Sequence, residues 1–351
     1  MQKIKNSYWK MRMGAFKKSQ RAWWCFKIFS ALFLFSMCAE FIANDRPILM
    51  YIKNYGLFTP VFHDYSEQDF GFELPTLADY KDVAVKSYIN ENGFAIWPIV
   101  EFDYRAINFD VENPSGLSLQ NFLGTDDHGR DVFARLLYGV RLSIIFAILT
   151  VALSSIFGII SGVGMGYFGG RFDLIFGRFI EVYNGLPQMF ILIIATGIFA
   201  PSFIILMIIM TVFSWTSLSG VVRAEVLKIR NMDYVIASKL FGLSNIKIIF
   251  RHVLPNSLTA IITYLPFAMI GAIGYLTALD FLGFGMPAGS ASLGDVLRQG
   301  KENLEHPILA ISGFFTVSFL LILLIFIGEG VRESFDIQGI KNSENGIKND
   351  K

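Results

Sequence analysis

The most constraining feature of this sequence is the length of its uncharged stretches. Four stretches lack Asp, Glu, Lys and Arg, and they comprise 29, 41, 28 and 23 residues, between Arg141 and Arg171, Glu181 and Arg223, Arg251 and Asp280, and Glu305 and Glu329. A transmembrane helix needs about 20 apolar residues, whereas a buried helix of a soluble protein has an apolar run of about 10–14. Three stretches therefore predict one membrane span each. The longest predicts two, with a turn at 200–202 because Pro201 would break a helix there.

A sixth span is predicted near the N-terminus, from Phe26 to Ala43. Its charge-free part, Ile28–Ala39, is short, but Lys27 and Glu40 lie near its ends and their side chains can extend to the headgroups. The alternative is a secretory signal peptide, which fits less well because aromatic residues precede the apolar run and no small-residue cleavage site follows it. A chain that is 53% hydrophobic and only 17% charged also suits a membrane protein better than a soluble one.

The distribution of Lys and Arg predicts the orientation of the six spans, because cytoplasmic loops are enriched in these residues. Residues 1–24 contain seven Lys and Arg and no acid, and residues 223–257 contain six against two acids. We therefore expect both termini and residues 223–257 in the cytoplasm, and residues 44–139 and 280–305 outside it. The net charge of +1 excludes the basic footprint of a nucleic-acid-binding protein. Two cysteines cannot form a disulfide framework.

Small residues recur at every fourth position of the predicted second span. They are Ser154, Gly158, Gly162 and Gly166. Small residues at this spacing allow two membrane helices to approach closely. Residues 164–169 also match the G-x-G-x-x-G pattern of dinucleotide-binding proteins, but no β-strand is predicted before them, as that fold requires. We interpret these residues as a helix-packing face, with a turn at 169–170 after the span.

The sequence lacks the groups that several classes of protein need. The four uncharged stretches hold no ionised group for a driving ion, which disfavours an ion-coupled carrier. There is no G-x-S-x-G nucleophile motif and no Walker motif, so the chain has no visible means of hydrolysing ATP itself. Asp126-Asp127-His128 lacks the spacing of a calcium loop, and the four histidines lack zinc-ligand spacing. We expect no catalytic site, no metal site and no directly bound cofactor.

Residues 223–257 are predicted to form two short helices. Asp233 can begin the first helix and Gly242 can end it, whereas the polar pair 244–245 can cap the second helix and Pro255 can end it. The apolar residues that would stay partly exposed unless a partner covered them are Val235, Leu240, Phe241 and Leu243. Two interpretations remain open from this pattern, a helix pair that rests on lipid and a docking site for a cytoplasmic protein.

The same segment resembles the coupling loop of ABC importer permeases, whose pattern is E-A-A, three residues, Gly, nine residues and I-x-L-P. The positions that match at the right spacing are Ala237, Gly242, Leu254 and Pro255. Ile236 stands where the family has Glu, and His252 begins the H-x-L-P-N form of the oligopeptide and dipeptide branch. The resemblance implies contact with an ATPase through Glu225, Asp233, Tyr234, Val235, Ala237, Gly242, Arg251, His252, Leu254 and Pro255. Glu225 and Asp233 are the candidate substitutes for the missing Glu.

Other segments resemble the C subunit of peptide permeases. Residues 123–132 with 136–141 resemble its signature before the second span, residues 166–173 its first internal turn, and residues 279–285 with 293–294 its last external loop. The signature residues are Gly124, Thr125, Asp126, Gly129, Arg130 and Asp131. The resemblance extends over residues 121–339 and weakly over 1–43. The insert at 44–120 makes the chain most similar to the microcin C-type (Yej) permeases of this branch.

This resemblance implies an all-α membrane protein with six transmembrane helices of the type I ABC importer fold and a small external insert between helices 1 and 2. The expected parts are a cytoplasmic N-terminus (1–25), helix 1 (26–43), a periplasmic insert and amphipathic segment (44–139), a permease core (140–328) and a cytoplasmic tail (329–351). Alternating residues at 102–104 and 107–111 predict β-strands in the insert. The insert either contacts a binding protein or packs over the channel mouth.

The function implied is that of a permease subunit of a bacterial inner-membrane ABC importer for peptides or peptide-like compounds, with microcin C-type peptide–nucleotide conjugates as one candidate. The implied partners are a second homologous permease, ATP-binding subunits that carry ATP and Mg²⁺, a periplasmic substrate-binding protein and membrane lipid, but no nucleic acid. Two alternatives stay open. A channel or gradient-driven carrier would transport in vesicles that hold this chain alone, and an intramembrane enzyme would need paired catalytic groups at one depth.

Overall fold

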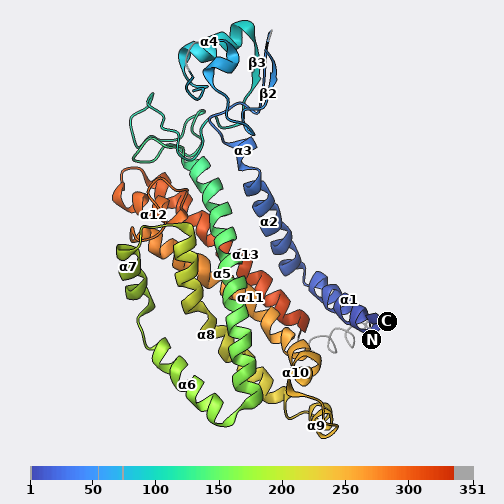
Figure 1. Ribbon diagram of the computed structural model, residues 1–351. Helices are drawn as coiled ribbons and strands as arrows, with labels where there is room; N and C mark the ends of the chain where they lie inside the picture. Colours follow the sequence, from blue (N-terminus) through green and yellow to red (C-terminus); the bar gives the residue numbers. More distant parts are fainter. Residues whose placement is uncertain (1, 54, 73–74, 336–351) are drawn as a thin grey trace, which may run out of the picture. The chain divides into compact units, whose positions relative to one another are not determined.

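The computed structural model describes residues 2–53, 55–72 and 75–335, and the chain divides into two compact units. The described part of unit 1 comprises residues 2–30, 144–279 and 319–335, and unit 2 comprises residues 31–143 and 280–318 with the gaps noted. Most of the predicted tail at 329–351 lies outside the described residues. Both units are built mainly from helices, which Figure 1 labels.

Four helices in the described chain are long and apolar enough to cross a membrane. They are α5 (Val132–Phe168), α8 (Phe203–Ile229), the continuous helix Asn245–Phe281 and α13 (Pro307–Phe335). A fifth span results if α6 (Gly170–Asn184) and α7 (Gln188–Ile198), which meet at an angle of 71°, count as one. The predicted turns at 169–170 and 200–202 are confirmed, because Gly169 separates α5 from α6 and residues 199–202 separate α7 from α8.

The predicted first span differs from the helices found there. α1 (Gln2–Lys18) is followed by α2 (Gln20–Met37), and Cys38 separates α2 from the short α3 (Ala39–Ile42). α2 is 18 residues long but is not apolar enough to count among the spans of the described chain, since the polar residues of its first half, Arg21 and Lys27 among them, lower its mean hydropathy. The predicted six spans are therefore confirmed only in part, as four or five.

Within unit 1, α5 and α8 approach each other through the small residues of α5. The nearest atom to a Cβ added at each glycine would be Trp215 O at 2.9 Å for Gly158, Ser219 O at 2.6 Å for Gly162 and Val226 Cβ at 2.7 Å for Gly166. Ser154, one turn earlier, is buried. Two of the three closest atoms belong to the backbone of α8, so a larger side chain would push the two helices apart.

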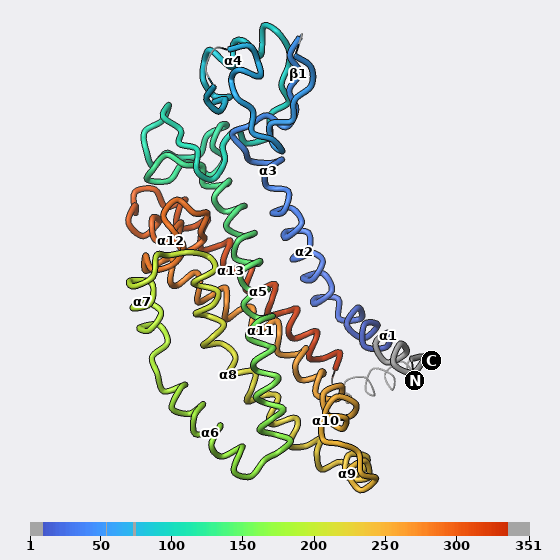
Figure 2. Tube along the Cα trace, viewed as in Figure 1, coloured from blue at the N-terminus to red at the C-terminus, as the bar shows by residue number. Residues whose placement is uncertain are grey.

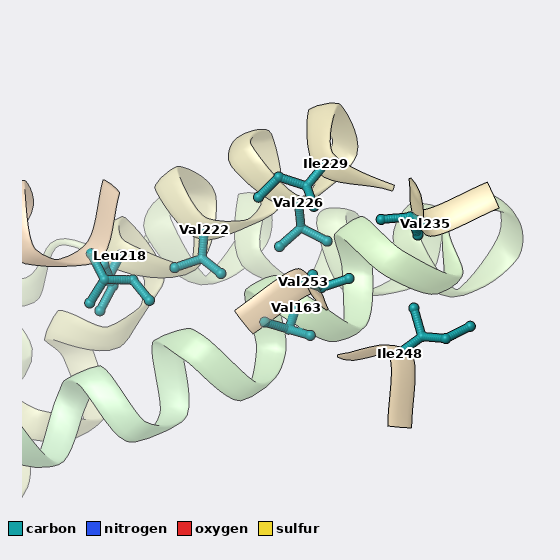
Figure 3. Close-up of a cluster of buried hydrophobic side chains, with 9 residues drawn as sticks. Val163, Leu218, Val222, Val226, Ile229, Val235, Ile248 and Val253 are labelled. Atoms are coloured by element: carbon teal, nitrogen blue, oxygen red, sulfur yellow. The ribbon is translucent and has the colours of Figure 1, made fainter. Parts of the chain in front are cut away.

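The core of unit 1 is a cluster of nine buried aliphatic residues, most of which Figure 3 labels. They are Val163 of α5, Leu218, Val222, Val226 and Ile229 of α8, Val235 of α9 (Asp233–Leu240), Ile248 of α10 (Asn245–Ile248), Val253 of the π-helical turn η2 (Ile249–Val253) and Ile261 of α11 (Leu254–Phe281). The cluster therefore joins the two long helices α5 and α8 to the short helices that follow α8.

The insert in unit 2 folds around a small sheet, while the rest of the described chain is mainly helical, as predicted. Strands β1 (Leu49–Ile52), β2 (Gly56–Phe58) and β3 (Gly93–Ile96) form an antiparallel sheet in the order β2-β1-β3, and α4 (Val83–Asn92) lies beside it (Figure 1). The buried core of the insert consists of Met50, Ile52, Phe70 of the 3-10 turn η1 (Glu67–Phe70), Tyr80, Val85 and Ile89. The insert therefore has a hydrophobic core of its own.

The strands predicted at 102–104 and 107–111 are wrong, because this stretch turns repeatedly. The Asp103 side chain accepts hydrogen bonds from the backbone N–H groups of Arg105 (2.7 Å) and Ala106 (2.5 Å). Asn108 accepts in the same way from the N–H of Asp110 at 3.0 Å. Such local bonds replace a strand ladder. Ile107 and Phe109 are exposed whereas Asn108 is buried, so the apolar side chains of this stretch do not face a core as those of a half-buried strand would. Its one pairing is an isolated bridge between Ile107 and Arg130.

We expect Gly162→Ala to destabilise the protein. The added methyl group would lie 2.6 Å from the Ser219 carbonyl oxygen, and overpacking of this kind costs about 1–3 kcal/mol. The matched control is Gly220→Ala on α8, where nothing lies within 4 Å of the added atom. Thermal unfolding of both purified variants in detergent measures the effect. Equal melting temperatures would show that α5 and α8 are not in close contact.

Candidate functional site

The first candidate site is the stretch of short helices from Arg230 to Pro255, named the 230–255 segment below. It connects α8 to α11, and α9 lies beyond the ends of these helices within unit 1 (Figures 1 and 2). Asp233 is the first residue of α9, and Gly242 follows the helix with φ 77°, a left-handed conformation that favours glycine. The predicted start and end of this helix are confirmed.

The predicted helix end at Pro255 is wrong. Pro255 is the second residue of α11, and the helix that begins with α10 continues through η2 into α11 without a break. The π-helical turn changes the hydrogen-bond pattern just before Pro255, so the proline occupies a position like the first turn of a helix, where its missing N–H is tolerated. Ser244 stands at the N-cap of α10, although its side chain makes no capping bond.

The 230–255 segment is held firmly against α5. The Tyr167 hydroxyl donates to Asn245 Oδ1 over 3.0 Å, and Arg230 Nη1 donates to the Gly166 carbonyl over 2.9 Å. Val235 is buried in the core cluster, which corrects the prediction that it would be exposed. Leu243 also packs against the cluster. These bonds and contacts join the segment to the long helices α5 and α8, so a displacement of the segment is transmitted to both helices.

The opposite face of the segment is apolar and exposed. Its large exposed side chains are Met232, Tyr234, Ile236, Leu240, Phe241, Ile246 and Phe250. Leu240 and Phe241 are the most exposed, at 83% and 85%, so no residue of the described chain covers them. Lys239, Lys247 and Arg251 are exposed around them, and Asp233 supplies the acid. Large exposed apolar side chains gathered on one short segment, with charged residues among them, indicate a binding surface.

Three residues of the segment meet between α9 and η2. The Ser238 hydroxyl donates to the Tyr234 carbonyl over 2.7 Å and lies 3.4 Å from Nε2 of His252. The rings of Tyr234 and His252 are 6.0 Å apart, and partial burial raises the pKa of the Tyr234 phenol. Ser238 was missed by the sequence reasoning, because a serine within a helix has no distinctive pattern.

The remaining residues of the predicted coupling set lie on three elements. Ala237 is half-buried on α9, Arg251 is exposed on η2 and Leu254 is half-buried at the start of α11. Glu225 lies on α8, outside the segment, with its carboxylate 3.4 Å from the Lys228 ammonium. Of the two candidates for the missing Glu, Asp233 is therefore the one on the exposed segment.

The second candidate site lies in unit 2 and is named the Asp126 cluster. It comprises Asp126, Arg130, Arg135, Asp295 and Gln299. The fully buried Asp126 carboxylate accepts hydrogen bonds from Arg130 Nε over 2.7 Å and from Arg135 Nη1 over 2.6 Å. It also accepts from the backbone N–H of Arg130 over 2.9 Å. Each oxygen of this buried charge therefore has a donor, as burial requires.

The Asp126 cluster fastens the start of α5 to α12 (Leu293–Glu302). The Arg135 guanidinium, itself fully buried, donates to Asp295 over 2.7 Å, and Gln299 donates to the same carboxylate over 2.9 Å. Burial of Asp295 opposes its charged form, but the guanidinium groups of Arg135 and Arg298 outweigh it and lower the pKa of Asp295. Arg135, Asp295 and Gln299 were missed, although Arg135 lies between two of the signature stretches.

The other signature residues shape the chain around the cluster. Asp131 accepts from the N–H of Ala134 over 2.7 Å at the start of α5, and burial raises the pKa of the Asp131 carboxyl. The Thr125 hydroxyl accepts from the Ser115 N–H over 2.9 Å. Gly124 and Gly129 have φ of 79° and 82°, which only glycine adopts readily. The structure therefore brings all six signature residues to one junction.

Asp126, Asp127 and His128 form the one group of three metal-ligand residues that the described chain places within 4.8 Å of one another. Asp126 Oδ2 already accepts from two guanidinium groups, which compensate the charge, and Oδ1 accepts from the backbone N–H groups of His128 and Arg130. Asp127 pairs with His128. A cation here would face the positive charges of Arg130 and Arg135 at close range. The geometry favours an ion-pair cluster over a metal site.

Spanning helices, a packed core cluster and an exposed apolar segment between two spans define a multi-pass membrane protein. The chain belongs to the family of binding-protein-dependent transport system inner membrane components, which matches residues 154–336. It is therefore an inner-membrane component of a transport system.

Three relatives share most of their length with this chain. The inner membrane ABC transporter permease protein YejE of Escherichia coli (strain K12) is 46% identical over 93% of this chain and 96% of the relative. The peptidoglycan transport system permease protein YejE of Agrobacterium fabrum is 43% identical over 93% and 92%. The oligopeptide transport system permease protein OppC of Lactococcus lactis subsp. cremoris is 36% identical over 67% and 81%. The resemblance stated from the motifs is confirmed.

We expect Asp126→Asn to destabilise the protein strongly. The substitution leaves the fully buried Arg135 guanidinium without its closest countercharge, and breaking a buried pair in this way costs about 3–5 kcal/mol. Asp127→Asn, which changes the neighbouring and more exposed acid, is the matched control. Yield of monodisperse protein and thermal unfolding in detergent are the measurements. Wild-type behaviour of Asp126→Asn would contradict a buried ion-pair role.

Proposed function

We propose that this chain is a permease subunit of an ABC importer that carries peptides or peptide-like compounds across the bacterial inner membrane. The observation that carries the proposal is its similarity, over nearly the whole chain, to permeases named for ABC, peptidoglycan and oligopeptide transport. Microcin C-type peptide–nucleotide conjugates fall in the same chemical class. Transport would proceed by alternating access, in which the spans open to one side of the membrane at a time.

Energy for transport would come from separate ATP-binding subunits. The uncharged stretches of this chain have no group to bind a driving ion, which supports a transport pathway that is powered by other subunits. The exposed apolar face of the 230–255 segment would dock on the ATPase subunit. ATP and Mg²⁺ would be bound by that subunit and not by this chain. Residues 223–257 carry six Lys and Arg against two acids, which supports placing this segment, and both termini, in the cytoplasm.

A second permease chain and a binding protein complete the proposed assembly. None of the residues of α6 is buried, although Leu174, Ile175, Phe179 and Val182 on it are large and apolar, which suits a surface covered by lipid and by a homologous permease. The substrate-binding protein would contact the periplasmic insert. The hydrophobic core of the insert suits a docking subdomain better than a loose loop.

Gly242→Val is expected to uncouple transport from ATP hydrolysis without preventing membrane insertion. The φ of 77° disfavours a β-branched residue by about 1–2 kcal/mol, and nothing lies within 4 Å of the added Cβ, so the strain stays local to the turn after α9. Peptide uptake by the full complex, reconstituted with its binding protein, is the measurement, alongside ATP hydrolysis. We expect uptake to fall at least tenfold.

The matched control for this variant is Gly56→Val, which introduces the same kind of strain at a φ of 97° in the insert, also with open space around the added atom. It should insert equally well and keep uptake within about twofold. Normal uptake by Gly242→Val would count against the coupling role of this turn.

Phe241→Asp tests the docking surface directly. A carboxylate in the centre of an apolar contact has to lose its hydration, so we expect the ATPase subunits to be lost from the complex during affinity purification. Leu119→Asp, a substitution of an equally exposed apolar residue in unit 2, serves as the control. Retention of the ATPase by Phe241→Asp, at the level of the control, would place its docking site elsewhere.

A further inference from the structure

A polar cavity lies among α5, α7, α8 and α11 inside unit 1. Its volume is about 170 Å³, and seven of its fourteen lining residues have polar but uncharged side chains. Ser155 of α5, Ser217 of α8 and Gly271 of α11 line it near the midpoints of their helices. The cavity therefore lies at the depth of the hydrocarbon core, where each unpaired polar group is costly.

Several of these polar groups have no partner in the described chain. The side chains of Ser155, Ser217, Tyr264 and Tyr275 make no hydrogen bond to any described residue, whereas Gln188 donates to the Phe213 carbonyl over 3.2 Å and keeps its own carbonyl oxygen free. Hydroxyl groups facing acyl chains would be unsatisfied. Water or a polar ligand in the cavity satisfies them, as in other polar cavities within membrane proteins.

We propose that this cavity is a section of the water-filled transport pathway in which the main chain of the transported peptide binds. The inference rests on the proposed function and deepens it. Each hydroxyl both donates and accepts, as does the Gln188 amide, and these groups match the N–H and C=O of a peptide unit. No Asp, Glu, Lys or Arg lines the cavity, so an ionised side chain would lack a countercharge there.

This composition gives the site no preference between acidic and basic side chains. A cavity of this size holds about six waters at ~30 Å³ each, or a short length of main chain in their place. A peptide would exchange its hydrogen bonds to water for bonds to Ser217, Tyr264 and their neighbours as it passes. Selection among peptides would then occur outside this cavity, and the cavity would recognise only the amide backbone that peptides share.

Cysteine labelling tests whether the cavity holds water. In a full complex that carries Cys25→Ser and Cys38→Ser, Ser217→Cys should react at least tenfold faster with a charged, membrane-impermeant thiosulfonate than Ile160→Cys, which is 67% exposed on α5 away from the cavity. The thiolate needed for the reaction forms in water and not in lipid. An excess of imported peptide should slow labelling of Ser217→Cys. Equal slow labelling of both cysteines, as expected if a second permease chain fills the cavity, overturns the proposal.

Filling the cavity tests whether peptides pass through it. Nothing lies within 4 Å of an added Cβ at Gly271, so Gly271→Leu fits the fold and occupies the cavity. Gly274→Leu, on the same helix and equally open but not lining the cavity, is the matched control. We expect Gly271→Leu to reduce uptake of neutral, acidic and basic tripeptides alike, by at least tenfold, and Gly274→Leu to keep uptake within twofold.

The outcomes separate this inference from the function on which it rests. If the wild-type complex imports none of the three tripeptides, the proposed function is wrong whatever the labelling shows. If the wild type imports them and Gly271→Leu imports them as well as Gly274→Leu does, the inference about the cavity is wrong and the function stands. A loss confined to one charge class contradicts recognition through the main chain.

Discussion

Backbone-to-backbone contact between α5 and α8 is the interaction on which the rest of unit 1 depends. A Cβ at Gly162 would lie 2.6 Å from the Ser219 carbonyl oxygen, and Gly158 and Gly166 repeat this approach one turn to either side. In lipid the hydrophobic effect does not drive helices together, so close packing at small residues has to do so. Where the row of glycines ends at Gly166, the Arg230 side chain bonds to its carbonyl, and the 230–255 segment begins.

Charge in this protein is placed where it is either compensated or close to water. The Asp126 cluster gathers two buried arginines and two acids at the start of α5 and along α12, and each carboxylate accepts from more than one donor. In unit 1, Arg223 near the end of α8 bonds both oxygens of Asp173 on α6, at 2.5 and 2.7 Å. These clusters fasten loops and helix ends, while the middle parts of the spans hold only neutral polar groups.

Much of this could be predicted from sequence, because the relevant signals are local. Uncharged stretches of 23 residues or more specify spans, Pro201 specifies a turn, and Gly242 specifies the end of α9. The signals that failed depend on tertiary context. The proline at position 255 predicts a helix end, but the π-helical turn before Pro255 allows the helix to continue. The alternation near Asp103 reads as a strand, but local side-chain bonds bend the chain.

The candidate sites show the same division between local and long-range information. The exposed segment around Gly242 could be recognised because its residues are adjacent in sequence. Only Asp126 and Arg130 of the Asp126 cluster could be predicted from sequence. Asp295 lies about 160 residues from its partner Arg135, and no sequence pattern links the two. The cavity lining could not be predicted at all, because Ser155, Ser217 and Gly271 come from three separate spans that are apolar on average.

The core cluster and the cavity share residues, and this connects the two ends of the proposed mechanism. Leu218 lies in the core cluster and also lines the cavity, and Tyr264 packs against the cluster while it lines the cavity too. Val235 and Ile248 of the short helices belong to that cluster. Because packed cores shift between discrete arrangements rather than deform continuously, a displacement of α9 has to be taken up by α8 and α11 together. Those two helices form part of the cavity wall, together with α5 and α7. In the proposed mechanism, a movement of the 230–255 segment would therefore change the width of the cavity.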